Sequence, residues 1–313
     1  MDPLRFICEQ DGFFTRAMAR ELGYDDKSVT RLVRAGVWTR FRRGYYCFTD
    51  LWSSLDEKAQ YLVRCRAVLH SLGNDVALSH ESGVIAHELG IWKPDLRHVH
   101  VTRLDGAQGR IEGDVIHHEG KWLDTEVVEV DGLRTMLPVR CALEYGTRAD
   151  SEQTLVVLDS LLHKGLADES DVGRQFEKMG AWPGARHLHV PVRMADGRSE
   201  SVGESRGRWI FWTLGVPAPD LQVKIHNTDG VLRGICDWGW LHLDVLGEFD
   251  GRVKYGRLLR PGQDVGEVVF AEKQREDELR EITGCTMIRL TWDDYQRPRL
   301  IRDRLLRLMK RAG

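Results

Sequence analysis

The sequence of 313 residues lacks several features that would place it quickly in a class of protein. It has no run of about 18 apolar residues, so no membrane span is expected. Its first residues, MDPLRFICEQDGFF, lack a basic region followed by a long apolar core, so secretion is not expected. Its six cysteines are scattered and form no C-x-x-C pair. This spacing favours reduced thiols in a cytoplasmic protein over a disulfide framework or a zinc site.

The sequence also lacks an excess of basic charge: it contains 45 Lys and Arg residues and 48 Asp and Glu residues. The formal net charge of −3 excludes a uniformly basic coat for nucleic acid but leaves local basic patches open. With 42% hydrophobic and 30% charged residues, the composition is that of a globular protein. The length predicts two or three compact units rather than one domain.

Residues 1–50 predict a winged helix-turn-helix domain. Helices are expected over residues 3–10, 15–23 and 26–35, followed by two strands that meet at an Arg43-Gly44 turn. Two short helices joined by a tight turn, with a β-hairpin behind the second, form the helix-turn-helix and its wing. The expected buried face of the third helix consists of Val29, Leu32 and Val33.

Basic side chains gather in the same segment. Residues 27–46 contain six basic residues and no acidic one. A cation placed at a phosphate releases condensed counterions, and polar side chains on the helix can read base edges, so we expect double-stranded DNA as the ligand. A protein-binding winged helix or a solvated basic face is the alternative. The predicted DNA-binding residues are Lys27, Ser28, Thr30, Arg31, Arg34, Arg40, Arg42 and Arg43.

The segment FFTRAMARELGYDDKSVTRLVRAGVWTRFRRGYY resembles the N-terminal winged helix of AbiEi-type antitoxins. The resemblance continues through ALSHESGVIAHELGIW (77–92), VHVTR (99–103) and VDGLRTMLPVRCALEYG (130–146), and covers roughly the first 175 residues. It implies a DNA-binding protein that represses its own promoter and opposes a nucleotidyltransferase-type toxin.

Residues 51–185 predict a mixed α/β middle domain without an enzyme motif. A connecting helix is expected over 53–73, strands over 98–102 and 127–130, and a helix over 152–163. A scaffold, dimerisation or partner-binding role is the default, so a homodimer is one expected arrangement. Histidines are frequent, but without the further ligands of a metal site we interpret them as structural or surface residues. They are His80, His87, His98, His100, His117 and His118.

Residues 186–313 predict a third domain with the element order αβββαβ. The expected elements are a helix over 201–215, strands over 221–225, 231–238 and 242–250, a helix over 268–284 and a strand over 285–292. A basic helix ends the chain. This order resembles the restriction-endonuclease-like core of PD-(D/E)XK nucleases, closest to the branch of the very-short-patch repair endonucleases. The fold class is therefore a multidomain mixture of α+β and α/β.

The nuclease resemblance implies DNA hydrolysis with Mg²⁺ (or Mn²⁺), because hard cations bind carboxylate oxygens and polarise a phosphate. Asp237 and Glu248 would be the main metal ligands, with Glu204 contributing from the helix. The family's commonest pattern has a lysine two residues after the second acid, where this sequence has Asp250. The catalytic cation would then be Lys254 or Lys273.

These features lead to two hypotheses. The first is a DNA-binding protein with a metal-dependent endonuclease domain, used in defence against phage or other foreign DNA. The alternative is a non-enzymatic antitoxin or autorepressor whose nuclease fold is inactive. The carboxylates can also be interpreted as a solvated end of a sheet, without any role in metal binding.

Overall fold

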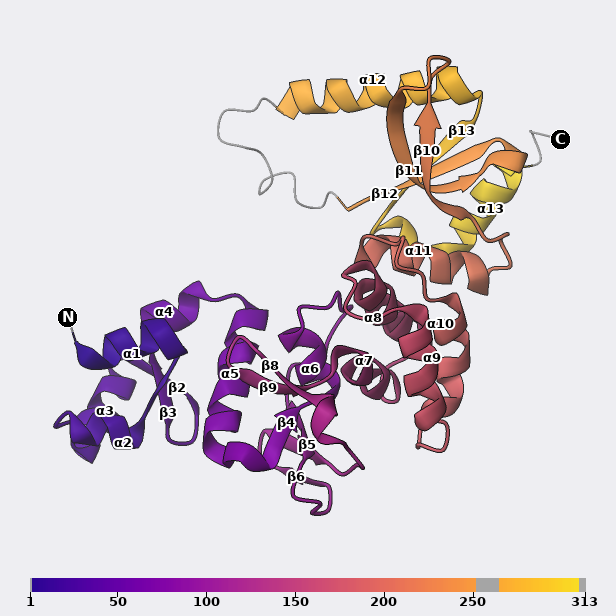
Figure 1. Ribbon diagram of the computed structural model, residues 1–313. Coiled ribbons are helices and arrows are strands. Elements are labelled where there is room, and N and C mark those ends of the chain that lie inside the picture. Colours follow the sequence, from indigo (N-terminus) through magenta and orange to yellow (C-terminus); the bar gives the residue numbers. More distant parts are fainter. Residues whose placement is uncertain (1, 252–264, 310–313) are drawn as a thin grey trace. The chain divides into compact units, whose positions relative to one another are not determined.

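The computed structural model describes residues 2–251 and 265–309, with side chains described throughout except over 265–273 (Figure 1). Its contacts divide the chain into two compact units, one of residues 1–157 and 166–189 and the other of residues 158–165 and 190–313. The division into three domains stays a prediction. Among the described helices, none has the length and apolar character needed to cross a membrane.

The N-terminal winged helix forms around an aromatic core. Its strands pair in the order β1-β3-β2, and Phe14, Trp38, Tyr46 and Phe48 are buried between this sheet and the helices. Gly44 takes a φ of +82°, a left-handed conformation that suits the turn of the wing. The predicted helices and hairpin are confirmed, whereas the short β1 was not predicted. The elements are α1 (Pro3–Asp11), β1 (Phe14–Thr15), α2 (Arg16–Glu21), α3 (Asp26–Arg34), β2 (Trp38–Arg42) and β3 (Tyr45–Phe48).

Two helices follow where one was predicted. They are α4 (Thr49–Ser54) and α5 (Glu57–Leu72). The break occurs because Asp56 takes an extended conformation and caps α5, with its carboxylate accepting from the Ala59 backbone N–H at 2.8 Å.

A mixed six-stranded sheet forms the middle region, in the order β6-β7-β5-β4-β9-β8. β4 pairs parallel with β9 and β5 pairs parallel with β7, while the other pairs are antiparallel. The strands are β4 (Val76–Leu78), β5 (Val99–Arg103), β6 (Arg110–Glu112), β7 (Val115–His118), β8 (Val127–Val130) and β9 (Leu133–Met136). The helices are α6 (His80–Ala86), α7 (Pro138–Gly146), α8 (Ser151–His163) and α9 (Glu169–Lys178), with α10 (His189–Met194) after them.

The C-terminal unit contains a four-stranded sheet in the order β10-β11-β12-β13, with β12 and β13 parallel. Trp238 and Trp240 on one face pack against α11 and α13, and Leu246 on the other face packs against Leu279 of α12. The sheet therefore lies between two helical layers (Figure 1). Its elements are α11 (Val202–Thr213), β10 (Asp220–His226), β11 (Leu232–Trp240), β12 (Val245–Asp250), α12 (Val265–Thr283), β13 (Thr286–Thr291) and α13 (Pro298–Met309).

The prediction that the third strand of this unit begins at residue 242 was wrong. Residues 241–243 form a 3₁₀ turn, and Asp244 takes a left-handed φ of +50°, so that β12 begins only at Val245. Asp244 therefore does not share a strand face with Glu248. A short polar side chain such as that of Asp tolerates this backbone conformation.

Candidate DNA-binding surface and carboxylate cluster

The sequence of α3 places its apolar and basic side chains on different faces. Val29 is buried, and Leu32 and Val33 pack partly buried against the aromatic core, as predicted. The carboxylate of Asp25 accepts from the Ser28 backbone N–H at 2.7 Å and caps the helix. The helix is thereby held with its basic face toward solvent.

Five cations of α3 and the wing are exposed and, within the described part of the chain, form no ion pair. They form the basic set: Lys27, Arg31, Arg34, Arg40 and Arg43. Several arginines elsewhere are paired with nearby acids, as in the pairs Arg97–Asp95 at 2.5 Å and Arg198–Asp196 at 2.7 Å. The basic set is therefore free to contact an external anion.

Three other predicted DNA-binding residues are engaged inside the protein. Arg42 forms an ion pair with Asp114, which lies before β7 in the middle region. The Thr30 hydroxyl donates to the backbone oxygen of Asp26 at 2.8 Å, and the Ser28 side chain hydrogen-bonds the Asp25 carboxyl, which lowers the pKa of that carboxyl. The ion pair occupies the Arg42 guanidinium, whereas the two hydroxyls each keep lone pairs that can accept a further hydrogen bond.

The second candidate site, here called the carboxylate cluster, comprises Glu204, Asp237 and Glu248. Glu204 lies in the first turn of α11, Asp237 in β11 and Glu248 in β12. Close packing seats α11 on the sheet, because a Cβ at Gly203 would lie 1.9 Å from the Phe249 ring. The Tyr295 hydroxyl also donates to the Gly203 oxygen at 2.7 Å. The fold thus brings together three acids that are distant in the sequence.

Electrostatics of the cluster are unfavourable when all three acids are ionised. Burial, then the Glu204 carboxylate and next that of Glu248, raise the pKa of Asp237 to about 7, although a hydrogen bond from the Phe249 backbone N–H at 2.7 Å opposes the rise. Burial also raises the pKa of Glu204, whose Oε2 accepts from Gln222 Nε2 at 3.0 Å. At neutral pH the Asp237 carboxyl is therefore protonated in a large fraction of the molecules, whereas an ordinary aspartate is ionised.

Glu248 is held differently, by two arginines. One carboxylate oxygen accepts from Arg275 of α12 and the other from Arg289 of β13 at 3.2 Å. Arg289 also pairs with Glu276 at 3.3 Å. Sequence reasoning missed both arginines. A charged side chain inside the apolar strand TMIRLT was the signal that could have identified Arg289.

The arrangement of these residues does not fit Mg²⁺ or Mn²⁺. Three carboxylates supply the hard oxygen ligands that such ions prefer, but guanidinium groups occupy both oxygens of Glu248. In the residues that the structure describes, no group of three or more His, Cys, Asp and Glu side chains is placed to hold a metal ion.

Of the three remaining predicted catalytic residues, the structure describes the side chain of Asp250 but not those of Lys254 and Lys273. Asp250 ends β12, partly exposed. Lys254 lies outside the described residues. The backbone of Lys273 belongs to α12, but its side chain is not among those described.

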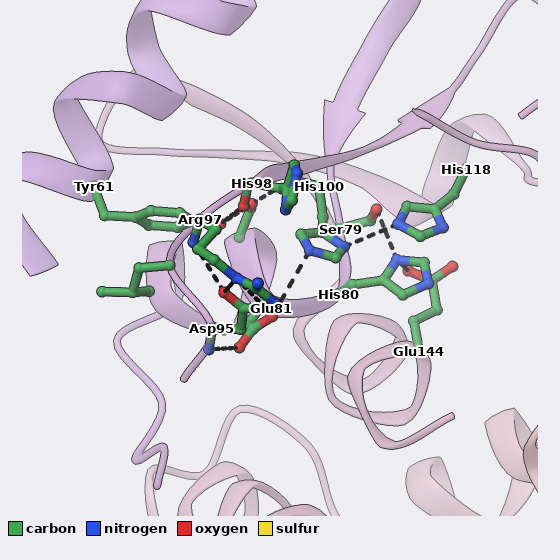
Figure 2. A network of polar contacts seen from close by, with 12 residues as sticks. Tyr61, Ser79, His80, Glu81, Asp95, Arg97, His98, His100, His118 and Glu144 are labelled. Carbon is green, nitrogen blue, oxygen red and sulfur yellow. Dashed lines mark hydrogen bonds and ion pairs between the residues drawn. The ribbon is translucent and has the colours of Figure 1, made fainter. Parts of the chain in front are cut away.

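A third group of polar residues, the histidine network, lies inside the middle region (Figure 2). The rings of His80 and His118 stack with centroids 3.6 Å apart, and His100 Nδ1 lies 3.0 Å from His118 Nε2. Glu144 Oε2 lies 3.6 Å from His80 Nδ1, and Glu81 Oε2 lies 3.7 Å from His100 Nε2. Burial lowers the pKa of His100 to about 4 and that of His118 to about 3, so the imidazoles are neutral at pH 7.

Comparisons with known proteins match the N-terminal domain most directly. Residues 2–49 match a family described as "Transcriptional regulator, AbiEi antitoxin". This match covers the winged helix and all members of the basic set. It supports the predicted winged helix and the resemblance to AbiEi antitoxins for this part of the chain.

Longer relatives add little about activity. The chain is 25% identical over 184 residues to two proteins of Mycobacterium tuberculosis, "Uncharacterized protein MT2308" and "Uncharacterized protein Rv2248". The matched part is 58% of this chain and 64% of each relative, so the chain spans less than two thirds of their length. Among solved structures, the RV2827C protein of Mycobacterium tuberculosis matches with a TM-score of 0.40 and 15% identity, over 70% of this chain and 83% of that one.

Proposed function

We propose that the chain is a DNA-binding transcriptional regulator that contacts double-stranded DNA through its winged helix. The observation that carries this proposal is the basic set, whose five cations are exposed without ion pairs in the described structure. The family matched by residues 2–49 supports it. In this proposal α3 enters the major groove, while Arg40 and Arg43 of the wing contact phosphates.

The finer part of the proposal concerns an antitoxin role. The protein would repress its own promoter and oppose a nucleotidyltransferase-type toxin, as the resemblance to AbiEi antitoxins implies. The description of the matched family, which names a transcriptional regulator and an antitoxin, supports the coarser role. Co-expression tests this part. Rescue of growth from the product of an adjacent toxin gene is expected, and no rescue by the wild type would refute the antitoxin role while leaving DNA binding standing.

The DNA-binding proposal is tested by titrating the promoter fragment upstream of the gene at several salt concentrations. The test variant combines Arg31→Ala, Arg34→Ala and Arg43→Ala, and the control combines Arg97→Ala, Arg174→Ala and Arg198→Ala, three arginines that pair with nearby acids. Each lost phosphate contact flattens the slope of log affinity against log salt by about 0.9. We therefore expect a slope change of about 2 to 3 for the test variant and a much smaller one for the control. Equal slopes for both variants would overturn the proposal.

DNA hydrolysis by the C-terminal unit is a second candidate, with Mg²⁺ or Mn²⁺ as its proposed cofactor, and it requires that Arg275 and Arg289 first release the carboxylate of Glu248. The observation that favours it is the order α11-β10-β11-β12-α12-β13, which gathers Glu204, Asp237 and Glu248. Nicking of plasmid DNA by the wild type, lost in Asp237→Ala and Glu248→Ala, is the expected result. Equal cleavage by all three proteins, or none by the wild type, would exclude it.

A further inference from the structure

We propose that α13 carries a second surface for double-stranded DNA, in the C-terminal unit and separate from the winged helix. The basic helix predicted at the end of the sequence is α13, which contains four arginines and a single acid, Asp303. The DNA-binding proposal and the hydrolysis candidate do not involve this helix. Its arginines belong to one element of one compact unit, so their arrangement follows from the geometry of a single helix.

The apolar side of α13 is fixed in the core of the unit. Ile301, Leu305 and Met309 follow one another at four-residue intervals and are buried in the core that α13 shares with α11 and the sheet. The Arg302 guanidinium also donates from Nε to the backbone oxygen of Leu214, at the end of α11, at 3.1 Å. These contacts hold the helix in one orientation, with its opposite side toward solvent.

Three arginines lie on that opposite side, and a fourth immediately precedes the helix. All four are exposed, and within the described part of the chain they form no ion pair or side-chain hydrogen bond. At about 3.6 residues per turn and 1.5 Å per residue, the three in the helix form a row about 12 Å long. Asp303 on the same side pairs with Arg302 at 3.9 Å. The four are here called the α13 set: Arg297, Arg299, Arg304 and Arg307.

The stability of α13 does not account for these arginines. Arg299 lies in the first turn, where the positive end of the helix dipole disfavours a cation. Arg304 and Arg307 are one turn apart, and like charges at that spacing repel each other. Within the helix, Arg307 in the last turn has the favourable position relative to the dipole. Cations that the helix itself does not require point to an anion outside the protein.

Three other exposed arginines of the same unit differ from the α13 set because each has an acidic partner. They form the pairs Arg198–Asp196, Arg233–Glu278 and Arg280–Glu276. Exposure alone therefore does not leave an arginine of this unit without a partner. The three paired arginines also supply a control of equal charge for the experiment below.

The chemistry of the helix favours the backbone of a DNA duplex as the anion. Every member of the α13 set is an arginine, whose planar guanidinium binds a phosphate with two parallel hydrogen bonds. The helix has no aromatic side chain on which the bases of a single strand would stack. Its apolar side is buried in the core and cannot insert into a membrane. A duplex, which presents its phosphates outward, fits such a surface.

Titration of the full chain with a labelled duplex of arbitrary sequence, at several salt concentrations, tests the inference. The starting protein is the triple alanine variant of the winged helix described above, so that the remaining binding reports other surfaces. Adding Arg299→Ala, Arg304→Ala and Arg307→Ala should flatten the slope of log affinity against log salt by a further amount of about 2 to 3, because each lost phosphate contact removes about 0.9. Circular dichroism should stay unchanged, since alanine favours a helix.

Two further variants separate charge from structure. Lysine at the same three positions keeps the charge and should retain most of the slope. The control combines Arg198→Ala, Arg233→Ala and Arg280→Ala, which removes the same charge from paired arginines and should change the slope much less. Equal slopes for the α13 variant and the control would overturn the inference, as would the absence of any duplex binding by the starting protein.

Two other ligands are tested in parallel. A single strand of the same length that binds more tightly than the duplex would overturn the inference. So would anionic phosphatidylserine vesicles whose binding is lost in the α13 alanine variant while the salt slope for the duplex is unchanged. Because the winged helix and the α13 set are altered separately, a winged-helix variant without any effect on the slope would refute the DNA-binding proposal and leave this inference standing.

Discussion

The winged helix and the carboxylate cluster both gather charge of one sign, but they do so in opposite surroundings. The cations of the basic set are exposed and lie on neighbouring elements of a short segment. The acids of the carboxylate cluster are partly or fully buried and come from α11, β11 and β12. Water screens like charges at the first site and does so poorly at the second.

This difference determines how each site is stabilised. The exposed cations need no internal partner and remain available to a ligand. Buried carboxylates must be protonated or paired, and the cluster uses both solutions: the pKa of Asp237 is raised by burial and by Glu204, while Arg275 and Arg289 bind Glu248. Charge without a partner at the surface is therefore free to contact a ligand, whereas buried charge costs stability unless something compensates it.

We expect Asp237→Asn to produce the largest change in stability. This variant tests directly how much the buried charge of Asp237 costs. A raised carboxyl pKa means that the folded protein holds its proton more tightly than the unfolded chain, so this contribution to stability is lost as pH rises from about 4 to about 7. The amide of asparagine does not ionise, so the variant does not lose this contribution to stability as the pH rises. We expect the variant to be more stable than the wild type at pH 8, by on the order of 3 kcal/mol, with the difference shrinking toward pH 4.

Urea unfolding at pH 5 and pH 8 without divalent cations measures this difference. Asp220→Asn, at an exposed position on the neighbouring strand β10, is the matched control and should change stability little at either pH. A wild type that is more stable than Asp237→Asn at pH 8 would show that the cluster is not under electrostatic strain.

For the histidine network we expect a smaller effect on stability. Its pH dependence has the opposite sign, because stability here is lost as the pH falls. Burial lowers the pKa of His118 to about 3, so the unfolded chain takes up a proton near pH 6.5 that the folded protein refuses. Stability from this residue is therefore present above pH 6.5 and is lost as the pH falls. Glu81, with its pKa raised to about 7 by burial, contributes in the opposite direction in both proteins.

Comparison of His118→Gln with the wild type isolates the contribution of this residue. Between pH 6 and pH 4, the wild type should lose about 1.4 kcal/mol per pH unit relative to the variant. His242→Gln is the matched control at an exposed position. A stability difference between His118→Gln and the wild type that does not change with pH would show that His118 titrates alike in the folded and unfolded states.

Sequence reasoning succeeded where the determinants are local. The cap at Asp25, the glycine turn at Gly44 and the spacing of apolar residues in α3 all act within a few residues, so the winged helix was predictable. Contacts between distant segments were not predictable. Arg42 meets Asp114, which is 72 residues away, and Glu248 meets Arg289, which is 41 residues away. One sequence shows which charges exist but not which of them the tertiary fold pairs.

Arg42→Ala is the smallest expected effect and tests whether an internal partner removes a cation from DNA binding. Because Arg42 is paired with Asp114 and largely buried, its loss should flatten the salt slope of DNA binding by much less than that of Arg43→Ala, for which about 0.9 is expected. Asp114→Asn releases the guanidinium and should strengthen binding slightly, an effect that Arg42→Ala in the same protein should abolish. If Arg42→Ala instead flattens the slope as much as Arg43→Ala does, the ion pair opens on DNA, and pairing in the free protein does not distinguish structural from DNA-binding arginines.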